Sequence, residues 1–459
     1  MIDSGHILLA ADITAQTGFL AGNGAWMLTA ASFVLLMTPA VAFFYGGMCR
    51  SKSILNMLML SAGAMIVVSV IWPLWGYSMA FGTEDYIGLF SDPFENFLLN
   101  SIVESHDGVF GVVPGAGLHP ESYAGTIDVV FQLTFAVIAV ALISGAIAER
   151  VKFSTWLIFV TLWVTFVYAP MAHMVWGGGL LSGEENSVSS FIFGGNTGER
   201  GKWNANVIPH DFAGGTVVHI NAGIAALVTT LIIGKRSGFK KETMRPHNLP
   251  FVMLGAFLLW FGWFGFNAGS TFAANDGAGY AWISTSAATG AAALGWLITE
   301  RIRDGKFTSL GAASGIVAGL VAITPAADVV SPGFAILLGL IAGALCCLAV
   351  GLKLRFNYDD SLDVVGVHFV GGLVGTILIG FFATETGMFN DGGPKQLIIQ
   401  VLIALIAIIY SGVITTIITF ALEKTIGWRV TEEEEILGID YANHGETAYD
   451  FVASSGLGK

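Results

Sequence analysis

Long apolar windows alternate with short polar segments along almost the whole chain. A helix needs about 20 mostly apolar residues to cross the hydrocarbon core of a bilayer, and eleven such windows can be drawn in this sequence. Backbone groups cannot stay unpaired in lipid, so windows of this length predict helices. The sequence therefore predicts an all-α polytopic membrane protein with eleven transmembrane helices. The expected spans are 25–47, 55–81, 126–148, 153–175, 211–234, 250–273, 278–299, 308–326, 333–352, 362–384 and 396–423.

The composition agrees with this pattern. Of the 459 residues, 54% are hydrophobic and only 12% are charged, which is about half the charged share of a soluble domain. The 59 glycines allow membrane helices to approach closely, so tight helix packing is expected. The three cysteines form neither a disulfide framework nor a metal-type spacing. We expect a multi-pass protein of the cell membrane, in contact with the lipid bilayer, with no nucleic-acid partner and no cofactor.

The lysines and arginines set the expected orientation. Arg50 and Lys52 follow the first span, and this side is interpreted as cytoplasmic because basic loops are retained there. Alternation of the spans then puts all but three of the 20 basic residues on the same side. The exceptions are Arg200, Lys202 and Lys395. The N-terminal segment 1–24 is therefore expected outside the cell and the tail 424–459 inside.

Two of the expected outer loops are long. Residues 82–125 contain seven acidic residues and no basic one, and residues 177–210 are rich in Gly, Ser and Asn. The field of such loops could draw cations toward the outer face. Ordinary solvated loops would explain the same composition equally well.

Two short segments, in the fifth and tenth spans, resemble each other. "VVHINAG" (217–223) and "GVHFVGG" (366–372) each contain Val-His with a glycine four places after the histidine. Each also follows an aspartate, Asp211 in the first and Asp363 in the second. The offset of five spans is odd, so the two halves would insert with opposite orientation, as in transporters with inverted repeats. Within the membrane domain 25–423, the expected units are repeat one at 25–234, repeat two at 250–384 and an eleventh helix at 396–423.

The two histidines of these segments are expected to meet inside the membrane. His219 lies eight residues after Asp211, and His368 lies nine residues after Asp359. These separations correspond to roughly 12 and 13 Å along a helix, which places both rings near the middle of a core about 30 Å thick. Opposed helices would bring the rings together at that depth.

Three roles are open for this pair. A buried histidine can be structural, bonded to a carbonyl or hydroxyl, but intramembrane ionisable residues usually mark a pathway. A metal site would need further converging ligands, whereas Asp211 and Asp363 lie near helix starts, where they are expected to cap the helices and favour the helix dipole. Burial disfavours imidazolium, and two neutral rings can share one hydrogen bond while each still presents a nitrogen. This arrangement suits a small solute that donates or accepts hydrogen bonds.

Several motifs, in order along the chain from about residue 25 to 450, resemble the ammonium transporter (Amt/Mep) family. They are "FQLTF" (131–135), "AHMVWGGG" (172–179), "DFAGGTVVHINAG" (211–223), "GWFGFNAGS" (262–270), "DVVGVHFVGG" (363–372) and "GIDYANHGETAY" (438–449). The resemblance implies a non-enzymatic transporter of eleven helices with an inverted repeat, assembled as a homotrimer with one pore per subunit. Its substrate would be ammonium or ammonia, with methylammonium as a further candidate.

The resemblance also implies roles for individual residues. Trp176, Phe135 and Ser270 would form an outer recruitment site for ammonium, and Phe135 would stack on Phe266 as a gate below it. His219 and His368 would line the pore. Asp211 would support the recruitment site structurally. Trp176 favours the Amt branch over the related Rhesus proteins, which lack this aromatic site.

A mechanism follows from the cost of moving charge through an apolar constriction. Ammonium can lose a proton and cross as neutral ammonia, whereas potassium cannot. The acidic tail resembles the family's cytoplasmic regulatory tail, which couples subunits, and in bacterial and archaeal members this side docks a PII signalling protein. Two rival functions remain. One is an ammonium sensor on the same fold, which the short tail after the eleventh span disfavours, and the other is an intramembrane metalloenzyme using the two histidines.

Overall fold

The computed structural model describes residues 4–106, 109–113, 116–198 and 203–449. In this part of the chain, ten helical stretches are long and apolar enough to cross a membrane. They are Ala21–Met48, Ile54–Phe81, Gly125–Ile147, Phe153–Trp176, Gly215–Ile233, Leu249–Gly269, Asp276–Asp304, Pro332–Phe356, Val365–Phe382 and Lys395–Thr425. An eleventh apolar helix, Ser309–Ile323, is shorter, with 15 residues. The all-α architecture and the positions of the expected spans are confirmed, with the eighth span as a short helix.

Several spans are built from more than one helical segment. The α-helices are α1 (Ser4–Met48), α2 (Ile54–Ile71), α3 (Tyr77–Phe81), α4 (Gly125–Ile147), α5 (Phe153–Trp163), α6 (Ala169–Trp176), α7 (Val188–Phe193), α8 (Asn221–Ile233), α9 (Leu249–Gly269), α10 (Asp276–Asp304), α11 (Ser309–Ile323), α12 (Pro332–Ala349), α13 (Leu352–Phe356), α14 (Val370–Phe382), α15 (Lys395–Thr425) and α16 (Glu432–Leu437). π-Helical segments within spans are η1 (Trp72–Gly76), η3 (Val164–Tyr168), η4 (Gly215–Ile220) and η5 (Val365–Phe369), and η7 (Asp440–His444) lies in the tail. Short 3-10 turns are η2 (Phe97–Leu99) and η6 (Met388–Asn390).

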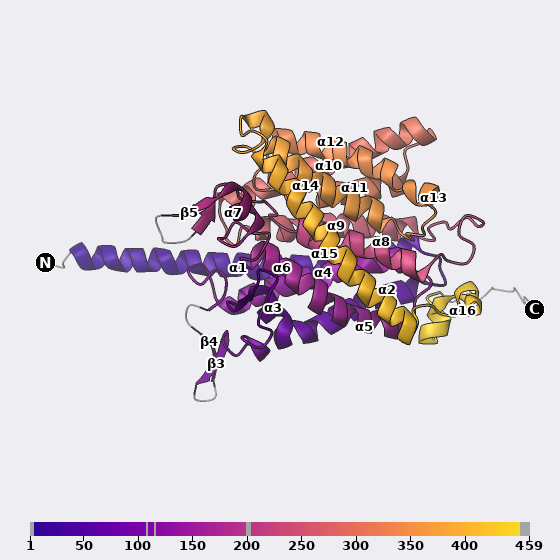
Figure 1. The fold of residues 1–459 in the computed structure, drawn as a ribbon, viewed down its shortest axis with the longest axis horizontal. Helices are drawn as coiled ribbons and strands as arrows, with labels where there is room; N and C mark the ends of the chain where they lie inside the picture. The colour runs from indigo at the N-terminus through magenta and orange to yellow at the C-terminus, as the bar shows by residue number, and fades with distance from the viewer. Residues whose placement is uncertain (1–3, 107–108, 114–115, 199–202, 450–459) are drawn as a thin grey trace, which may run out of the picture.

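Strands occur only as three small antiparallel hairpins in the described residues. They pair β1 (Asp85–Tyr86) with β2 (Phe90–Ser91), β3 (Val103–His106) with β4 (Val109–Val112), and β5 (Gly195–Thr197) with β6 (Trp203–Ala205). All three lie in the two long loops that the sequence placed outside, and Figure 1 shows β3, β4 and β5 at the same end of the helix bundle. We call this the loop end, and the opposite end, which carries α16 and the C-terminus, the tail end.

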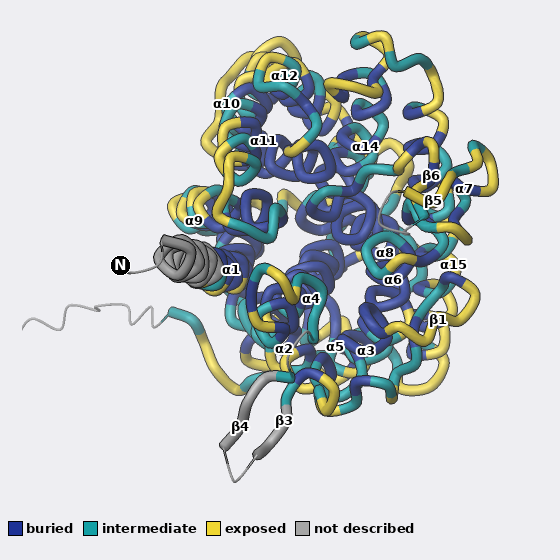
Figure 2. The backbone as a smooth tube through the Cα atoms, turned by 90° about the vertical axis from the view of Figure 1, so that its left-hand side faces the viewer, coloured by how far each residue is buried: buried dark blue, intermediate teal, exposed yellow. Residues whose placement is uncertain are grey.

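The bundle is tightly packed around a few central helices. Helix α1 packs against α9 and α4, α10 packs against α12 and α11, and α15 packs against α8 and α14. Figure 2 shows buried backbone at the centre and exposed backbone around the rim. Glycine allows the closest approaches, as expected: a Cβ atom on Gly265 of α9 would lie 2.6 Å from the carbonyl oxygen of Ala30 in α1. Helix α1 runs unbroken from Ser4, so it includes most of the N-terminal segment 1–24, and it projects beyond the loop end (Figure 1).

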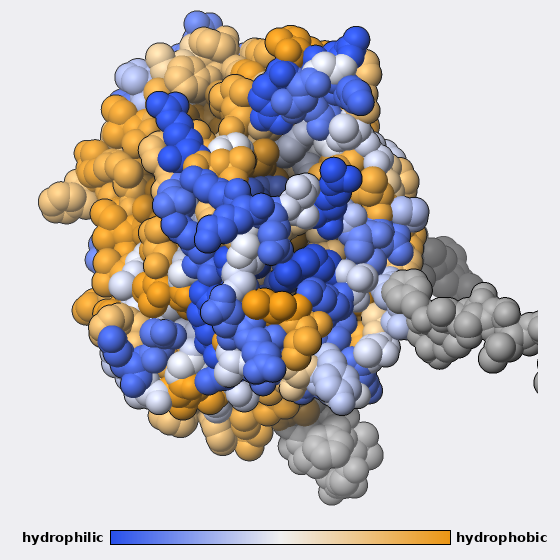
Figure 3. Space-filling view, turned by 90° about the vertical axis from the view of Figure 1, so that its right-hand side faces the viewer, coloured by the Kyte–Doolittle hydropathy of each residue, from blue (hydrophilic) through white to orange (hydrophobic). Residues whose placement is uncertain are grey.

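A buried ion network closes the tail end. The Arg236 guanidinium contacts Asp359 at 2.8 Å and Glu149 at 2.9 Å, and Glu149 also pairs with Arg50 at 3.0 Å. The C-terminal tail joins this end through Asp440, whose carboxylate accepts the backbone N–H groups that open α2. Figure 3 shows this end of the molecule as a hydrophilic, hollowed centre with apolar flanks, as expected of a bundle that crosses a membrane.

This network predicts a dependence of stability on pH. Burial alone would raise the pKa of Asp359, but its hydrogen bonds and charge interaction with Arg236 outweigh burial and hold that pKa below its ordinary value. The pKa of Glu149 is lowered in the same way by Arg236 and Arg50, against burial. A depressed carboxyl pKa adds stability that is present above its unfolded value, about 4, and is lost as the pH falls through the folded value.

We therefore expect the melting temperature of the detergent-solubilised protein to fall steeply below about pH 4. The decline should weaken in Arg236→Met, because that variant lacks the cation that holds both pKa values down. Arg303→Met is the matched control, since Arg303 pairs with Asp304 at 2.7 Å where both side chains are exposed, and it should keep the wild-type decline. An equal decline in all three proteins would contradict the assignment.

Candidate functional site

The two histidines lie at equivalent places in π-helical segments. His219 is the residue before the last in η4, and His368 is the residue before the last in η5. Both are buried, with exposed fractions of 1% and 3%. Their Nδ1 atoms are 3.3 Å apart, and their rings are inclined by 26°. The predicted meeting of the pair is confirmed. A hydrogen bond between two Nδ1 atoms requires one to donate and the other to accept, so at least one ring is neutral.

A glycine on each helix makes this approach possible. Gly223 lies four residues after His219, and a Cβ atom there would lie 2.5 Å from the backbone nitrogen of Phe369, the neighbour of His368. Gly372 lies four residues after His368, and a Cβ atom there would lie 2.9 Å from the Cβ of His219. Each glycine therefore admits the histidine segment of the other helix. Any side chain at either position would push the two rings apart.

Asp211 holds the start of the helix that carries His219. Its buried carboxylate accepts the backbone N–H groups of Gly214 at 3.1 Å, Thr216 at 2.9 Å and Val217 at 3.0 Å. These are groups that a helix start leaves without intrahelical partners. The expected cap at Asp211 is therefore present.

Asp360, and not Asp363, does the same for the helix that carries His368. The sequence assigned this role to Asp363, but the carboxylate of Asp360 accepts the N–H groups of Val364 at 3.1 Å and Val365 at 2.8 Å. Asp363 has a left-handed backbone with φ of 66°, and its carboxylate pairs with Lys353 at 2.6 Å. The spacing along the chain could have indicated Asp360, because Asp360 precedes His368 by eight residues, just as Asp211 precedes His219.

The three residues expected to recruit a cation line one cavity at the loop end. The cavity has a volume of about 930 Å³, and Phe135, Trp176 and Ser270 all contribute to its wall. Trp176 meets Phe135 edge to face, with 6.0 Å between ring centroids. The indole Nε1 of Trp176 donates to the backbone carbonyl of Asp211 at 2.8 Å, which fixes the ring. The Ser270 hydroxyl donates to the carbonyl of Phe266 at 2.8 Å, so its oxygen can still accept a bond. We call this cavity the vestibule.

Two stacked phenylalanines separate the vestibule from the histidines. Phe135 stacks on Phe266 with 4.2 Å between centroids and 20° between planes. Phe266 in turn faces His219 at 6.2 Å and 28°. The order Trp176, Phe135, Phe266, His219, His368 is therefore a continuous column of rings from the vestibule toward the interior.

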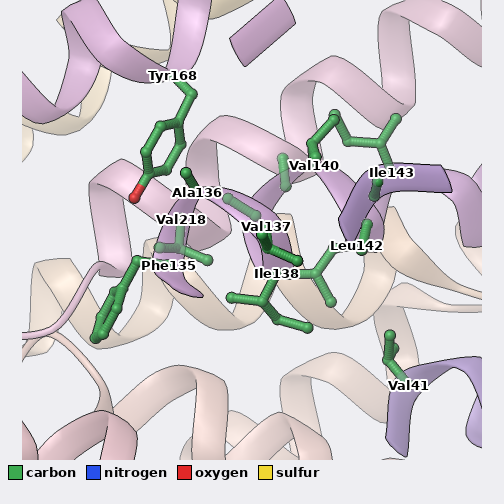
Figure 4. Packing of buried hydrophobic residues seen from close by; sticks show 14 of the residues in the cluster. Val41, Phe135, Ala136, Val137, Ile138, Val140, Leu142, Ile143, Tyr168 and Val218 are labelled. Carbon is green, nitrogen blue, oxygen red and sulfur yellow. The ribbon is translucent and has the colours of Figure 1, made fainter. Parts of the chain in front are cut away.

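Below the phenylalanines the path is narrow and apolar. The cavity beside the histidines holds only about 10 Å³ for a water-sized molecule, which is at the limit for a single water. Apart from the two histidines and Tyr45, its wall is hydrophobic. Figure 4 shows part of this packing around α4, where Ile138 and Leu142 lie near Val41 and Val218.

Sequence reasoning missed several residues of this site. Trp263 stacks on His219 with 5.5 Å between centroids and donates from Nε1 to Thr324 at 2.7 Å. It lies inside the motif "GWFGFNAGS" (262–270), and this position in a motif could have indicated its role. The loop 177–210, for which the sequence offered only its composition, forms part of the vestibule wall through Glu184, Glu185 and Trp203. Asp85, from the other long loop, also lines the vestibule.

The described residues supply no further ligands for a metal ion at the two histidines. Within the described residues, no group of three or more His, Cys, Asp or Glu side chains is placed to hold a metal ion. Asp211 and Asp360 are engaged with backbone N–H groups at the helix starts instead.

Comparison with known proteins identifies the family to which this chain belongs. Residues 25–449 match the Ammonium Transporter Family. The chain is 51% identical to the ammonium transporter of Mycobacterium tuberculosis (strain ATCC 25618 / H37Rv), over 95% of this chain and 91% of that protein. The solved structure of Saccharomyces cerevisiae Mep2 aligns with a TM-score of 0.76 at 30% identity and covers 90% of each chain. A structure described as a Sensor Amt Protein aligns with a TM-score of 0.80 at 28% identity, over 93% of this chain and 99% of that one.

Proposed function

This chain belongs to the ammonium transporter family, and from that premise we propose that it recruits NH4⁺ in the vestibule, removes a proton and conducts NH3 between His219 and His368. It is a multi-pass membrane transporter for ammonium and not an enzyme. The observation that carries the detailed proposal is the unbroken column of rings that joins the vestibule to the buried histidine pair.

The vestibule suits a small cation. A cation over the faces of Trp176 and Phe135 is attracted by the negative potential of the rings, and the oxygen of Ser270 can accept one of its N–H groups. Asp85, Glu184 and Glu185 line the same cavity and lower the electrostatic energy of a cation entering it. Asp211 contributes through its backbone carbonyl, which holds Trp176 in place.

The narrow segment favours the neutral species. A bare cation in an apolar constriction loses its hydration without compensation, and the free volume of about 10 Å³ leaves no room for a hydration shell. Ammonia is about the size of water and needs only a hydrogen-bond partner. Phe135 and Phe266 act as a gate above this segment, and the two histidines offer ring nitrogens to the passing molecule. Nε2 of His219 has no hydrogen-bond partner among the described residues, so it is open to such a bond.

Topology and assembly belong to the same proposal. The loop end faces outward and the tail end faces the cytoplasm, as the distribution of basic residues favours. Repeats 25–234 and 250–384 form an inverted pair, which the reciprocal contacts of Gly223 and Gly372 and the matched aspartates support. Helix 396–423 completes the domain 25–423, segment 1–24 is extracytoplasmic, and tail 424–459 is regulatory. The protein assembles as a homotrimer in the cell membrane, and a PII signalling protein is a candidate partner at the tail end.

A sensor role is the second candidate. The specific observation in its favour is the structural likeness to a protein described as a Sensor Amt Protein. A sensor would bind ammonium in the same vestibule, so binding alone cannot separate the two functions. Transmembrane flux separates them.

Flux in vesicles tests the proposal. We expect purified protein in liposomes to carry ammonium and methylammonium and to exclude potassium, as measured by substrate uptake and by current under matched gradients. Trp176→Leu removes the aromatic face, and a cation–π contribution of about 1 kcal/mol corresponds to a rise of about fivefold in KM for ammonium. Trp282→Leu is the matched control, because Trp282 is 46% exposed on α10 and stacks on Phe264, outside the pathway. Equal uptake of potassium and ammonium would contradict the proposal.

A further inference from the structure

A histidine and a buried aspartate meet at the rim of the vestibule, away from the residues already assigned. Asp128, in the first turn of α4, is fully buried, and its Oδ1 lies 3.0 Å from Nδ1 of His119. The hydroxyl of Tyr123 donates to the same carboxylate oxygen at 2.8 Å. The other oxygen, Oδ2, accepts the backbone N–H groups of Leu118 at 2.7 Å and His119 at 3.2 Å. The carboxylate is therefore held in place and in turn fixes the orientation of the imidazole.

The His119 ring takes part in the aromatic wall of the vestibule. It stacks on Phe272 with 4.0 Å between centroids and 20° between planes. Phe272 packs edge to face on Phe131, which contacts Phe135 at 4.8 Å. His119, Phe272 and Phe131 line the same cavity as Trp176 and Ser270. The His119 side chain is 27% exposed, and no hydrogen bond to its Nε2 is present among the described residues.

These contacts orient the His119 ring so that it can accept a hydrogen bond. With Nδ1–H donating to Asp128, the neutral imidazole carries its lone pair on Nε2. A histidine whose Nδ1 is bound by a buried carboxylate is a stronger acceptor at Nε2 than a free one, as in metal sites and catalytic dyads. A neutral imidazole beside an aspartate carboxylate gives the pair a net charge of −1.

We propose that the His119–Asp128 pair is a further binding station for ammonium and primary alkylammonium cations, in which Nε2 of His119 accepts an N–H group before the cation reaches Trp176. This inference rests on the proposed transport function and extends its recruitment site.

Other titratable groups lie around the His119–Asp128 pair. Tyr123 faces the pair from the same loop, and Glu121 is its exposed neighbour in sequence. Across the vestibule lie Asp85, His173, Glu184 and Glu185. His173 is itself bound to Asp85 at 2.9 Å and is buried, so it is not available to the cation in the same way.

The test uses the full chain in liposomes and measures KM and maximal flux for ammonium. His119→Phe keeps a ring that can stack on Phe272 but has no acceptor. We expect its KM to rise about fivefold, with unchanged maximal flux, as for the loss of one charge-assisted hydrogen bond in a partly solvated site.

Asp128→Asn separates a binding role from a structural one. Its amide oxygen can still accept the N–H groups of Leu118 and His119, so a purely structural role would leave KM unchanged. The proposal predicts a raised KM, since the negative charge is lost. Glu121→Gln removes an exposed charge from the same loop and should leave KM unchanged. A wild-type KM in His119→Phe would overturn the inference while leaving the transport function intact, whereas a wild-type protein that carries no ammonium would overturn the proposed function itself.

Discussion

Replacing both His219 and His368 with alanine is expected to abolish selective ammonium flux. The two rings supply the polar atoms of the narrow segment, where the free volume is about 10 Å³. Without them a passing ammonia finds no hydrogen-bond partner there, and the enlarged lumen no longer excludes hydrated ions by size. Groups that exchange protons with a reacting molecule typically contribute at least about 100-fold, so we expect a loss of that order in ammonium flux, in selectivity over potassium, or in both.

The measurement is the ratio of ammonium to potassium flux in liposomes containing the double variant. Thermal unfolding in detergent shows whether the variant is folded, and His247→Gln is the matched control because His247 lies at the tail end, where it contacts the carbonyl of Cys49 and the hydroxyl of Tyr449. Normal, selective ammonium flux in a folded double variant would show that the histidines only pack the interior. The single variants should be less affected, because the remaining ring still offers one partner.

The hydrophobic pattern was sufficient for the architecture and for the pairing of the histidines. Apolar windows long enough to cross a bilayer leave the chain no alternative to helices, and a fixed rise per residue puts His219 and His368 at similar depths. The aromatic residues of the vestibule were found through motifs, because thirty-three phenylalanines and twelve tryptophans cannot be sorted by composition. Their mutual geometry depends on contacts between helices far apart in the sequence.

Other features could not be predicted because they depend on tertiary contacts. The π-helical segments that carry both histidines shift the hydrogen-bond register of the backbone, and such segments occur often at functional sites. Nothing in the residues Gly215–Ile220 requires this register by itself. The wall that Trp203 and Glu184 add to the vestibule depends on how a long loop folds back. The cap at Asp360 was missed for a simpler reason. Asp363 lies nearer to His368 in the sequence and was chosen for this role, although Asp360 has the same spacing to His368 as Asp211 has to His219.

The two capping aspartates give the second large prediction. Asp360→Ala leaves the N–H groups of Val364 and Val365 without their acceptor in a buried place. An unsatisfied buried donor costs about 1–3 kcal/mol, so two of them should lower the free energy of unfolding by about 3 kcal/mol. Asp211→Ala removes the acceptor of three such groups and should lower it at least as much.

Asp363→Asn is the matched control for this prediction, because asparagine tolerates the left-handed backbone at this position. It removes an ion pair with Lys353 in which both side chains are partly exposed, and such a pair contributes about 1 kcal/mol or less. Asp360→Asn should recover part of the loss, because its amide oxygen can accept the same N–H groups.

Unfolding in detergent and ammonium flux in liposomes give the two measurements. Flux should follow stability in Asp211→Ala and Asp360→Ala, because each carboxylate fixes the π-helical segment that aims one histidine at the other. If Asp363→Asn were as damaging as Asp360→Ala, the helix start would depend on the ion pair and the cap would be misassigned. If both were harmless, the position of the histidines would be set by the crossing at Gly223 and Gly372 alone.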